Sequence, residues 1–154
     1  MLPKKLVFSF KYLVNRCLDD KIKGKYFTNK ISKKEKISFF ARVFSTLKIY
    51  SDYNLIELGQ QKICYQIKEE KILWRLSEIL QAFGHNEEWI TKIFYNYPIY
   101  KFKITSGNLR MFGYYSENVF YVLFFDTQHL VEPDDKFGIA DNLTCAWCIK
   151  NCDE

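Results

Sequence analysis

Three consecutive segments after Pro98 constrain the fold most, because apolar residues recur in them at about every second position. They cover residues 99–104, 109–115 and 119–125. The short stretches between them, 106–108 and 116–118, consist of Ser, Gly, Asn and Glu. Period-two alternation is typical of strands, and such polar stretches are typical of hairpin turns. The pattern therefore predicts a β-meander of three antiparallel strands. Its last strand is apolar throughout, so we expect it to be central and covered on both faces.

Helical spacing of apolar residues predicts four helices, over residues 33–50, 53–58, 71–83 and 87–95. Ser32 with Glu35 forms a capping box for the first helix, and Asn86 is a candidate N-cap for the last. Short strands are predicted over 6–10 and 63–67. The predicted fold class is α+β: a three- to four-stranded antiparallel β-meander over about 98–131, packed against amphipathic helices, with a helical N-terminal extension.

The charge of the chain is unevenly distributed along its length. Its 154 residues fit one domain, 1–154. Residues 1–36 hold eleven Lys or Arg against three acidic residues, a net charge of +8, whereas residues 131–154 have a net charge of −4. We therefore predict a basic arm over 1–36 and an acidic tail over 133–154. A basic arm suits a polyanionic partner, although a solvated lysine-rich surface would have the same composition.

The number of cysteines and the hydropathy pattern indicate the cellular compartment that we expect for this protein. Five cysteines cannot all pair within one chain, so a reduced, cytoplasmic protein is expected. The longest uncharged apolar run, residues 119–125, is far too short to span a bilayer, and the N-terminus lacks a secretory pattern. We therefore expect no membrane partner.

Strand parity predicts a functional surface on the meander. In the first strand Lys101 and Lys103 project opposite to their apolar neighbours, and in the second strand Arg110 and Tyr114 share a side. If the apolar sets face the helices, these four residues lie together on an exposed sheet face. Cations that bind phosphates beside rings that stack on bases predict nucleic-acid binding, with Lys101, Lys103 and Arg110 as the phosphate contacts. An ordinary solvated sheet face is the alternative.

The same region offers groups for RNA cleavage without a metal. Cleavage through the 2′-hydroxyl needs a proton acceptor, a proton donor for the leaving oxygen and cations at the phosphate. His129, Tyr114 and Arg110 are the predicted catalytic residues. Asp126 precedes His129 by three residues and could orient its imidazole, or it could instead cap the turn that follows the strand.

The order of elements over about 62–131 resembles the RelE/ParE-like toxin fold. The resemblance lies mainly in residues 97–131: the segment NLRMFGYY at 108–115, the segment VFYVLFFD at 119–126, and His129. It implies a small bacterial ribonuclease or gyrase poison, with Arg110 and His129 at matching positions and Tyr114 or Tyr115 as an aromatic contact. A second register, which opens the fold with strand 6–10 and the helices of 33–58, stays open.

Two functions follow as predictions. The first is a RelE-like toxin of a toxin–antitoxin or phage-defence module. It would be a metal-independent endoribonuclease of the mRNA-interferase type, with RNA or the ribosome as target and an antitoxin protein as partner. The second is a non-enzymatic protein of a mobile element that binds nucleic acid or inhibits a host or defence complex.

The cysteines near the C-terminus raise the question of a metal. Cys145, Cys148 and Cys152 form a C-x₂-C-x₃-C pattern that could supply three thiolates to zinc. A fourth ligand would come from His129, Cys64 or His85. Because a second closely spaced pair is missing, the prediction is that no cofactor is bound and that zinc is the alternative.

Overall fold

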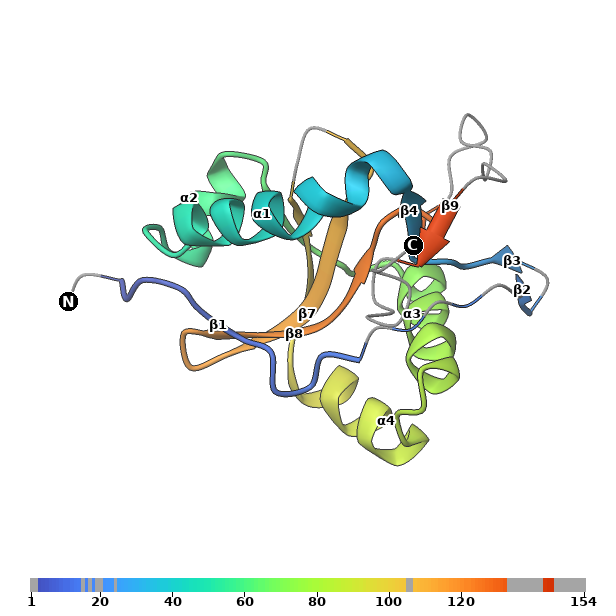
Figure 1. Ribbon diagram of the computed structural model, residues 1–154. Helices are drawn as coiled ribbons and strands as arrows, with labels where there is room; N and C mark the ends of the chain where they lie inside the picture. The colour runs from blue at the N-terminus through green and yellow to red at the C-terminus, as the bar shows by residue number, and fades with distance from the viewer. Residues whose placement is uncertain are drawn as a thin grey trace.

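The computed structural model describes residues 3–14, 16, 18, 21–23, 25–104, 107–132 and 143–145 (Figure 1). Within these residues the strands and helices follow one another in this order: β1 (Val7–Ser9), β2 (Lys21–Ile22), β3 (Lys25–Tyr26), β4 (Lys30–Ser32), α1 (Lys33–Tyr50), α2 (Leu55–Gln60), β5 (Cys64–Gln66), α3 (Glu70–Ala82), α4 (Glu87–Asn96), β6 (Ile99–Lys103), β7 (Arg110–Ser116), β8 (Val119–Asp126) and β9 (Leu143–Cys145).

The main sheet has five strands in the order β1-β8-β7-β6-β5. The pairs β8–β7, β7–β6 and β6–β5 are antiparallel, whereas β1 runs parallel to β8 with Val7 opposite Val119. The three meander strands are present as predicted, and β8 lies between two neighbours. The predicted three- to four-stranded antiparallel sheet is nevertheless wrong, because the sheet is five-stranded and mixed. Two short strands from before residue 67 complete it.

The predicted helical N-terminal extension is also wrong. The chain enters the main sheet at residue 7, and the backbone N–H of Leu6 donates to the Tyr53 carbonyl at 2.9 Å. The following helices, α1 and α2, pack on the sheet rather than extending away from it (Figure 1). The physical reason is burial: the apolar face of α1, with Phe39, Val43 and Leu47, needs a partner, and the sheet supplies it.

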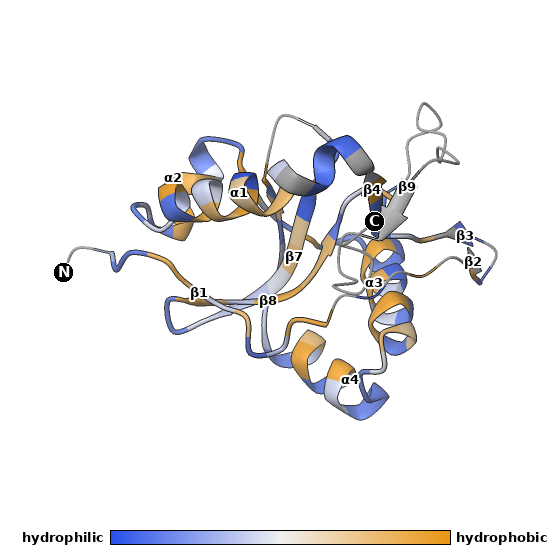
Figure 2. Ribbon diagram, in the orientation of Figure 1, coloured by the Kyte–Doolittle hydropathy of each residue, from blue (hydrophilic) through white to orange (hydrophobic). Residues whose placement is uncertain are grey.

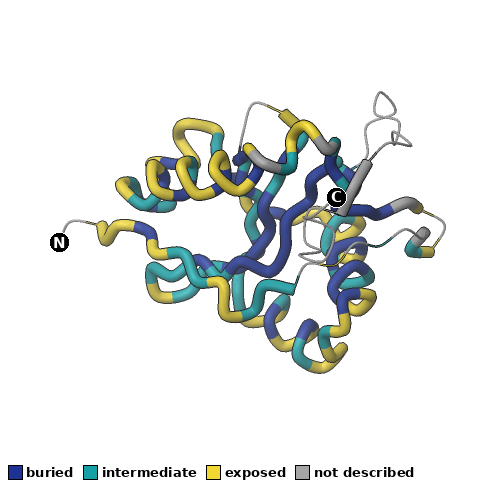
Figure 3. Tube along the Cα trace, in the orientation of Figure 1, coloured by how far each residue is buried: buried dark blue, intermediate teal, exposed yellow. Residues whose placement is uncertain are grey.

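Helices cover both faces of the sheet, which gives three layers and two cores. On one face Phe102, Met111 and Phe120 pack with residues of α1 and α2. On the other face Phe112 and Phe124 pack with residues of α3 and α4. The buried run through β7 and β8 lies between these helical layers (Figure 3), and hydrophobic and hydrophilic stretches alternate along α3 and α4 (Figure 2).

A β-bulge changes which side chains of β8 face each core, so that Phe124 packs in one core and Phe120, Val122 and Phe125 pack in the other. The register slips between Phe112 and Gly113, so that Leu123 is the extra residue of β8. Gly113 lies at this irregularity, and a Cβ there would meet the Tyr121 carbonyl oxygen at 2.2 Å. Only glycine fits such a close backbone approach.

Side-chain caps fix where the helices begin. The Ser32 hydroxyl accepts from the backbone N–H of Glu35 at 3.3 Å and donates to the Glu35 carboxylate at 2.8 Å. The Asn86 side chain accepts from the N–H of Trp89 at 3.2 Å. Ser32 and Asn86 are therefore confirmed as N-caps. Glu35 contacts the Ser32 hydroxyl rather than the backbone N–H that a capping box would use, and this contact holds the Glu35 carboxylate at the start of α1.

Candidate functional site

The predicted sheet face exists, but it is only partly open to solvent, since Lys101, Lys103 and Arg110 are half-buried. Lys103 lies opposite Arg110 in the β6–β7 register, and Tyr114 lies opposite Ile99 on the same side. This is the side that α3 and α4 cover, and Tyr114 is only 4% exposed. The expectation that the apolar sets alone face helices was wrong, because the sheet has a helical layer on each face.

Each of the three sheet cations has a partner within the protein. The Lys101 ammonium forms an ion pair with the Glu132 carboxylate at 2.6 Å. The Lys103 ammonium donates to the Tyr65 hydroxyl at 3.0 Å and lies 5.0 Å from the centre of that ring. The Arg110 guanidinium donates to the carbonyl oxygens of Gly107 at 2.6 Å and Leu109 at 3.0 Å.

Tyr114 belongs to an aromatic cluster. Its ring stacks on Tyr121 at 4.8 Å and lies 5.0 Å from the ring of Tyr97. Burial raises the pKa of Tyr114 above its ordinary value. A buried phenol with a raised pKa stays neutral and is poorly placed to contact a polyanion.

Asp126 caps the turn after β8, which was one of its two predicted roles. Its carboxylate accepts from the backbone N–H groups of Leu130 at 2.9 Å and Val131 at 2.8 Å. The turn brings Glu132 to Lys101 and places His129 in the left-handed region, at φ 59°. The Nδ1 of His129 is buried and has no hydrogen-bond partner within the part of the chain that the structure describes.

The predicted zinc ligands are only partly visible. Cys148 and Cys152 lie outside the described residues, as does the side chain of Cys145. Cys64 is buried in β5, and burial raises the pKa of its thiol to about 12. Among the described residues, no group of three or more His, Cys, Asp or Glu side chains is placed to hold a metal ion. The predicted absence of a cofactor and the zinc alternative therefore both stay untested predictions.

Exposed cations gather instead on the outer face of α1. Lys34 and Lys48 lie about 40° apart on the side of this helix away from its buried residues, and Arg42 lies about 80° from Lys34 at the edge of that side. All three are exposed. Their side-chain charges have no acidic partner among the residues described here, and Glu35 is the one acidic residue of this helix. We call these three residues the α1 cationic face.

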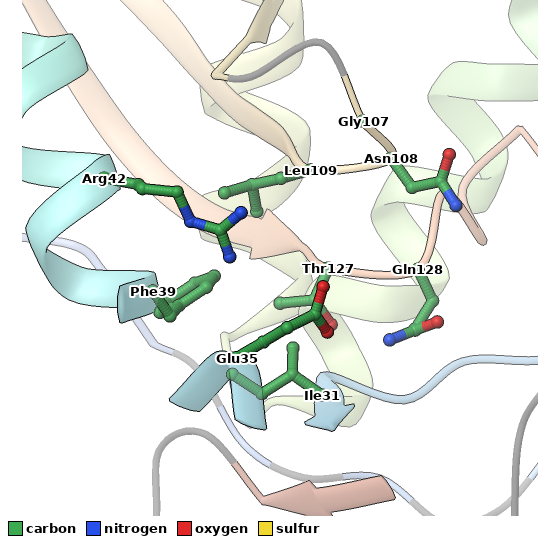
Figure 4. A pocket seen from close by; sticks show the side chains of 9 residues that line it. All are labelled: Ile31, Glu35, Phe39, Arg42, Gly107, Asn108, Leu109, Thr127 and Gln128. Carbon is green, nitrogen blue, oxygen red and sulfur yellow. The ribbon is translucent and has the colours of Figure 1, made fainter. Parts of the chain in front are cut away.

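A polar cavity of about 260 Å³ opens beside the α1 cationic face. Its lining comes from β4, α1, the loop before β7 and the turn after β8 (Figure 4). Figure 4 shows the Arg42 guanidinium, the Glu35 carboxylate and the Gln128 amide directed toward the same opening. Asn108 and Thr127 add an amide and a hydroxyl. The arrangement can bind a small ligand with several hydrogen-bonding groups.

Sequence reasoning missed both features, for different reasons. The cationic face has a sequence signal, because Lys34, Arg42 and Lys48 all fall outside the apolar positions of a predicted helix. Because the basic arm was predicted to end at residue 36, Lys34 was assigned to it and Arg42 and Lys48 were not. The cavity has no such signal, since its lining runs from Ile31 to Gln128 and depends on tertiary contacts.

The fold and its surface define a three-layer α+β protein with a five-stranded mixed sheet and an exposed basic helix. Residues 9–154 match the family model described as "Uncharacterised protein UU032", and the chain belongs to this family. No curated protein and no solved structure matches the chain. The resemblance to RelE/ParE-like toxins stays a prediction. None of the described helices is both long enough and apolar enough to cross a bilayer.

Proposed function

We propose that this protein binds nucleic acid without catalysis, through the α1 cationic face. The observation that carries the proposal is the exposure of Lys34, Arg42 and Lys48 on one helix, with no acidic partner among the described residues. Lys or Arg side chains that are not neutralised within the protein are free to replace the counterions of a phosphate backbone. The net charge of +8 over residues 1–36 strengthens the field at this end of the chain.

The spacing of the three cations suits a phosphate backbone. At a rise of about 1.5 Å per residue, Arg42 lies about 12 Å along the helix from Lys34, and Lys48 about 9 Å further. The cations therefore extend over about 21 Å, which is long enough to reach several successive phosphates. Ser38, Ala41 and Ser45 lie between them on the exposed side and are small, so that a strand can approach the helix closely.

The state of the predicted catalytic residues favours binding over cleavage. Tyr114 is buried, Arg110 is bonded to backbone carbonyls, and Asp126 is occupied by the turn. A general acid or base needs to lie within hydrogen-bond reach of the reacting group. The non-enzymatic alternative raised by the sequence is accordingly the one that we retain.

The test measures the affinity of the full chain for a fluorescent 12-nucleotide RNA at low salt. Replacing Lys34, Arg42 and Lys48 together by Ala should weaken binding roughly tenfold or more, because three phosphate contacts are lost. The matched control replaces Lys68, Lys71 and Lys92 by Ala, which removes the same charge from the α3–α4 layer. An equal loss of affinity in both triple variants would contradict the proposal, because net charge alone would then explain binding.

A further inference from the structure

We infer that the cavity beside α1 receives one unpaired nucleobase that carries an exocyclic amino group. This inference rests on the proposed function, since the cavity lies next to the helix face that would hold the phosphates. Arg42 belongs to both: it is exposed on α1 and also lines the cavity. A strand bound along α1 would therefore bring a base to the opening.

The floor of the cavity is apolar and the rim is polar. Ile31 and Phe39, which are 4% and 2% exposed, form part of the lining beneath the polar side chains. An apolar floor accepts the face or edge of a base, and polar groups at the rim read its hydrogen-bonding edge. Glu35 and Gln128 supply those groups (Figure 4), and Asn108 is a further polar residue of the lining.

The hydrogen bonds within the rim leave acceptors for the ligand. The Gln128 amide nitrogen donates to the Lys30 carbonyl, so the Gln128 carbonyl oxygen is left as an acceptor. The Thr127 hydroxyl donates to the same Lys30 carbonyl at 3.4 Å and keeps its lone pairs. The Ser32 hydroxyl fixes the Glu35 carboxylate through one oxygen, Oε2.

Arg42 supplies donors at the same opening, but the Glu35 carboxylate can only accept, so the base that meets it has to present a donor. Adenine, cytosine and guanine present an exocyclic N–H₂ donor, whereas uracil and thymine present only carbonyl acceptors at the corresponding position. A carboxylate also repels phosphate, so Glu35 would hinder backbone binding unless it contacts a base. Because pairing in a duplex occupies the amino group, the cavity should favour single strands.

The experiment compares the binding of oligo(C) and oligo(U) RNA 12-mers to the full chain at one salt concentration. The two bases differ at the position of the amino group. We expect oligo(C) to bind roughly tenfold more tightly, the factor that one good base contact contributes. In Glu35→Gln and in Gln128→Met the ratio of the two dissociation constants should fall toward one. The control Glu87→Gln removes the same charge from an exposed site on α4 and should keep the wild-type ratio.

The outcomes separate this inference from the proposed function. Tight, salt-sensitive binding with the same affinity for both oligomers would overturn the nucleobase inference and leave the proposed function standing. If neither oligomer binds at low salt, both are wrong. A preference for oligo(C) that persists in both pocket variants would place base recognition elsewhere on the protein.

Discussion

Asp126 shows how one buried carboxylate shapes the edge of the sheet. Its side chain is fully enclosed and accepts from the backbone N–H groups of three residues, Gln128, Leu130 and Val131. Burial raises the pKa of Asp126, although these donors and His129 act in the opposite direction. The cationic side chains of Arg75 and Arg110 also lie close enough to interact with it.

The raised pKa gives a testable dependence of stability on pH. Asp in an unfolded chain has a pKa of about 3.9. Because the folded-state pKa is higher, the folded protein binds more protons between the two values. The contribution of Asp126 to stability is therefore fully present below about pH 3.9 and is lost as pH rises through the folded-state pKa. Asp126→Asn lacks this titration, so the wild-type free energy of unfolding minus that of the variant should decrease from pH 3 to pH 7.

Urea unfolding of both proteins across this range measures the difference. A difference that increases with pH would mean that the N–H donors outweigh burial and depress the pKa of Asp126. In that case the account of this turn is wrong.

The side of the sheet on which a residue lies was predictable from strand parity. Its contacts with residues far away in the chain were not. The sequence correctly grouped Lys101, Lys103 and Arg110 on one side of the sheet. It could not reveal that Glu132 neutralises Lys101 or that Tyr65 contacts Lys103, because these partners are 31 and 38 residues away in the chain. Neither Glu132 nor Tyr65 belongs to a recognisable sequence pattern. The contact with Glu132 depends on the turn after β8, and the contact with Tyr65 depends on the position of β5.

At the scale of elements, β1 belongs to the main sheet, although the sequence predicted that residues 1–36 form a basic arm. Phe8 projects into the core, where its ring lies 6.0 Å from those of Phe102 and Phe120. Val7 is its neighbour on the other side of the strand and is 56% exposed. Phe8→Ala should lower the free energy of unfolding by about 2–3 kcal/mol, because a partly buried ring that packs against the core is lost. Val7→Ala should change it by no more than about 0.5 kcal/mol.

Chemical denaturation of the two variants and the wild type measures both effects. Equal, small effects would contradict the assignment of β1 to the sheet and would restore an N-terminal arm that folds independently of the core.

Elements with strong local patterns were the ones that the sequence predicted well. The helix over 33–50 and the meander strands have clear periods, and their caps and turns are local. The parallel pairing of β1 with β8 was not predictable, since it joins residues more than a hundred positions apart through only three residue pairs. The second helical layer was missed for a related reason, because an apolar side chain on a strand does not reveal which helix covers it.

For the whole molecule, the account depends on where unneutralised positive charge reaches the surface. The sheet cations are engaged within the protein, whereas the α1 cationic face is exposed. Electrostatic binding to phosphates has a characteristic signature, because each phosphate contact releases counterions and contributes to the dependence of affinity on salt.

The most direct measurement of the central claim is the slope of log Kobs against log[salt] for a single-stranded RNA 12-mer. Each phosphate contact contributes about −0.7 to this slope for a single strand. The triple variant Lys34→Ala, Arg42→Ala, Lys48→Ala should therefore have a slope shallower than that of the wild type by about 2, and Lys68→Ala, Lys71→Ala, Lys92→Ala should keep the wild-type slope. Identical slopes for the wild type and the α1 variant would contradict the claim that this helix holds the nucleic acid.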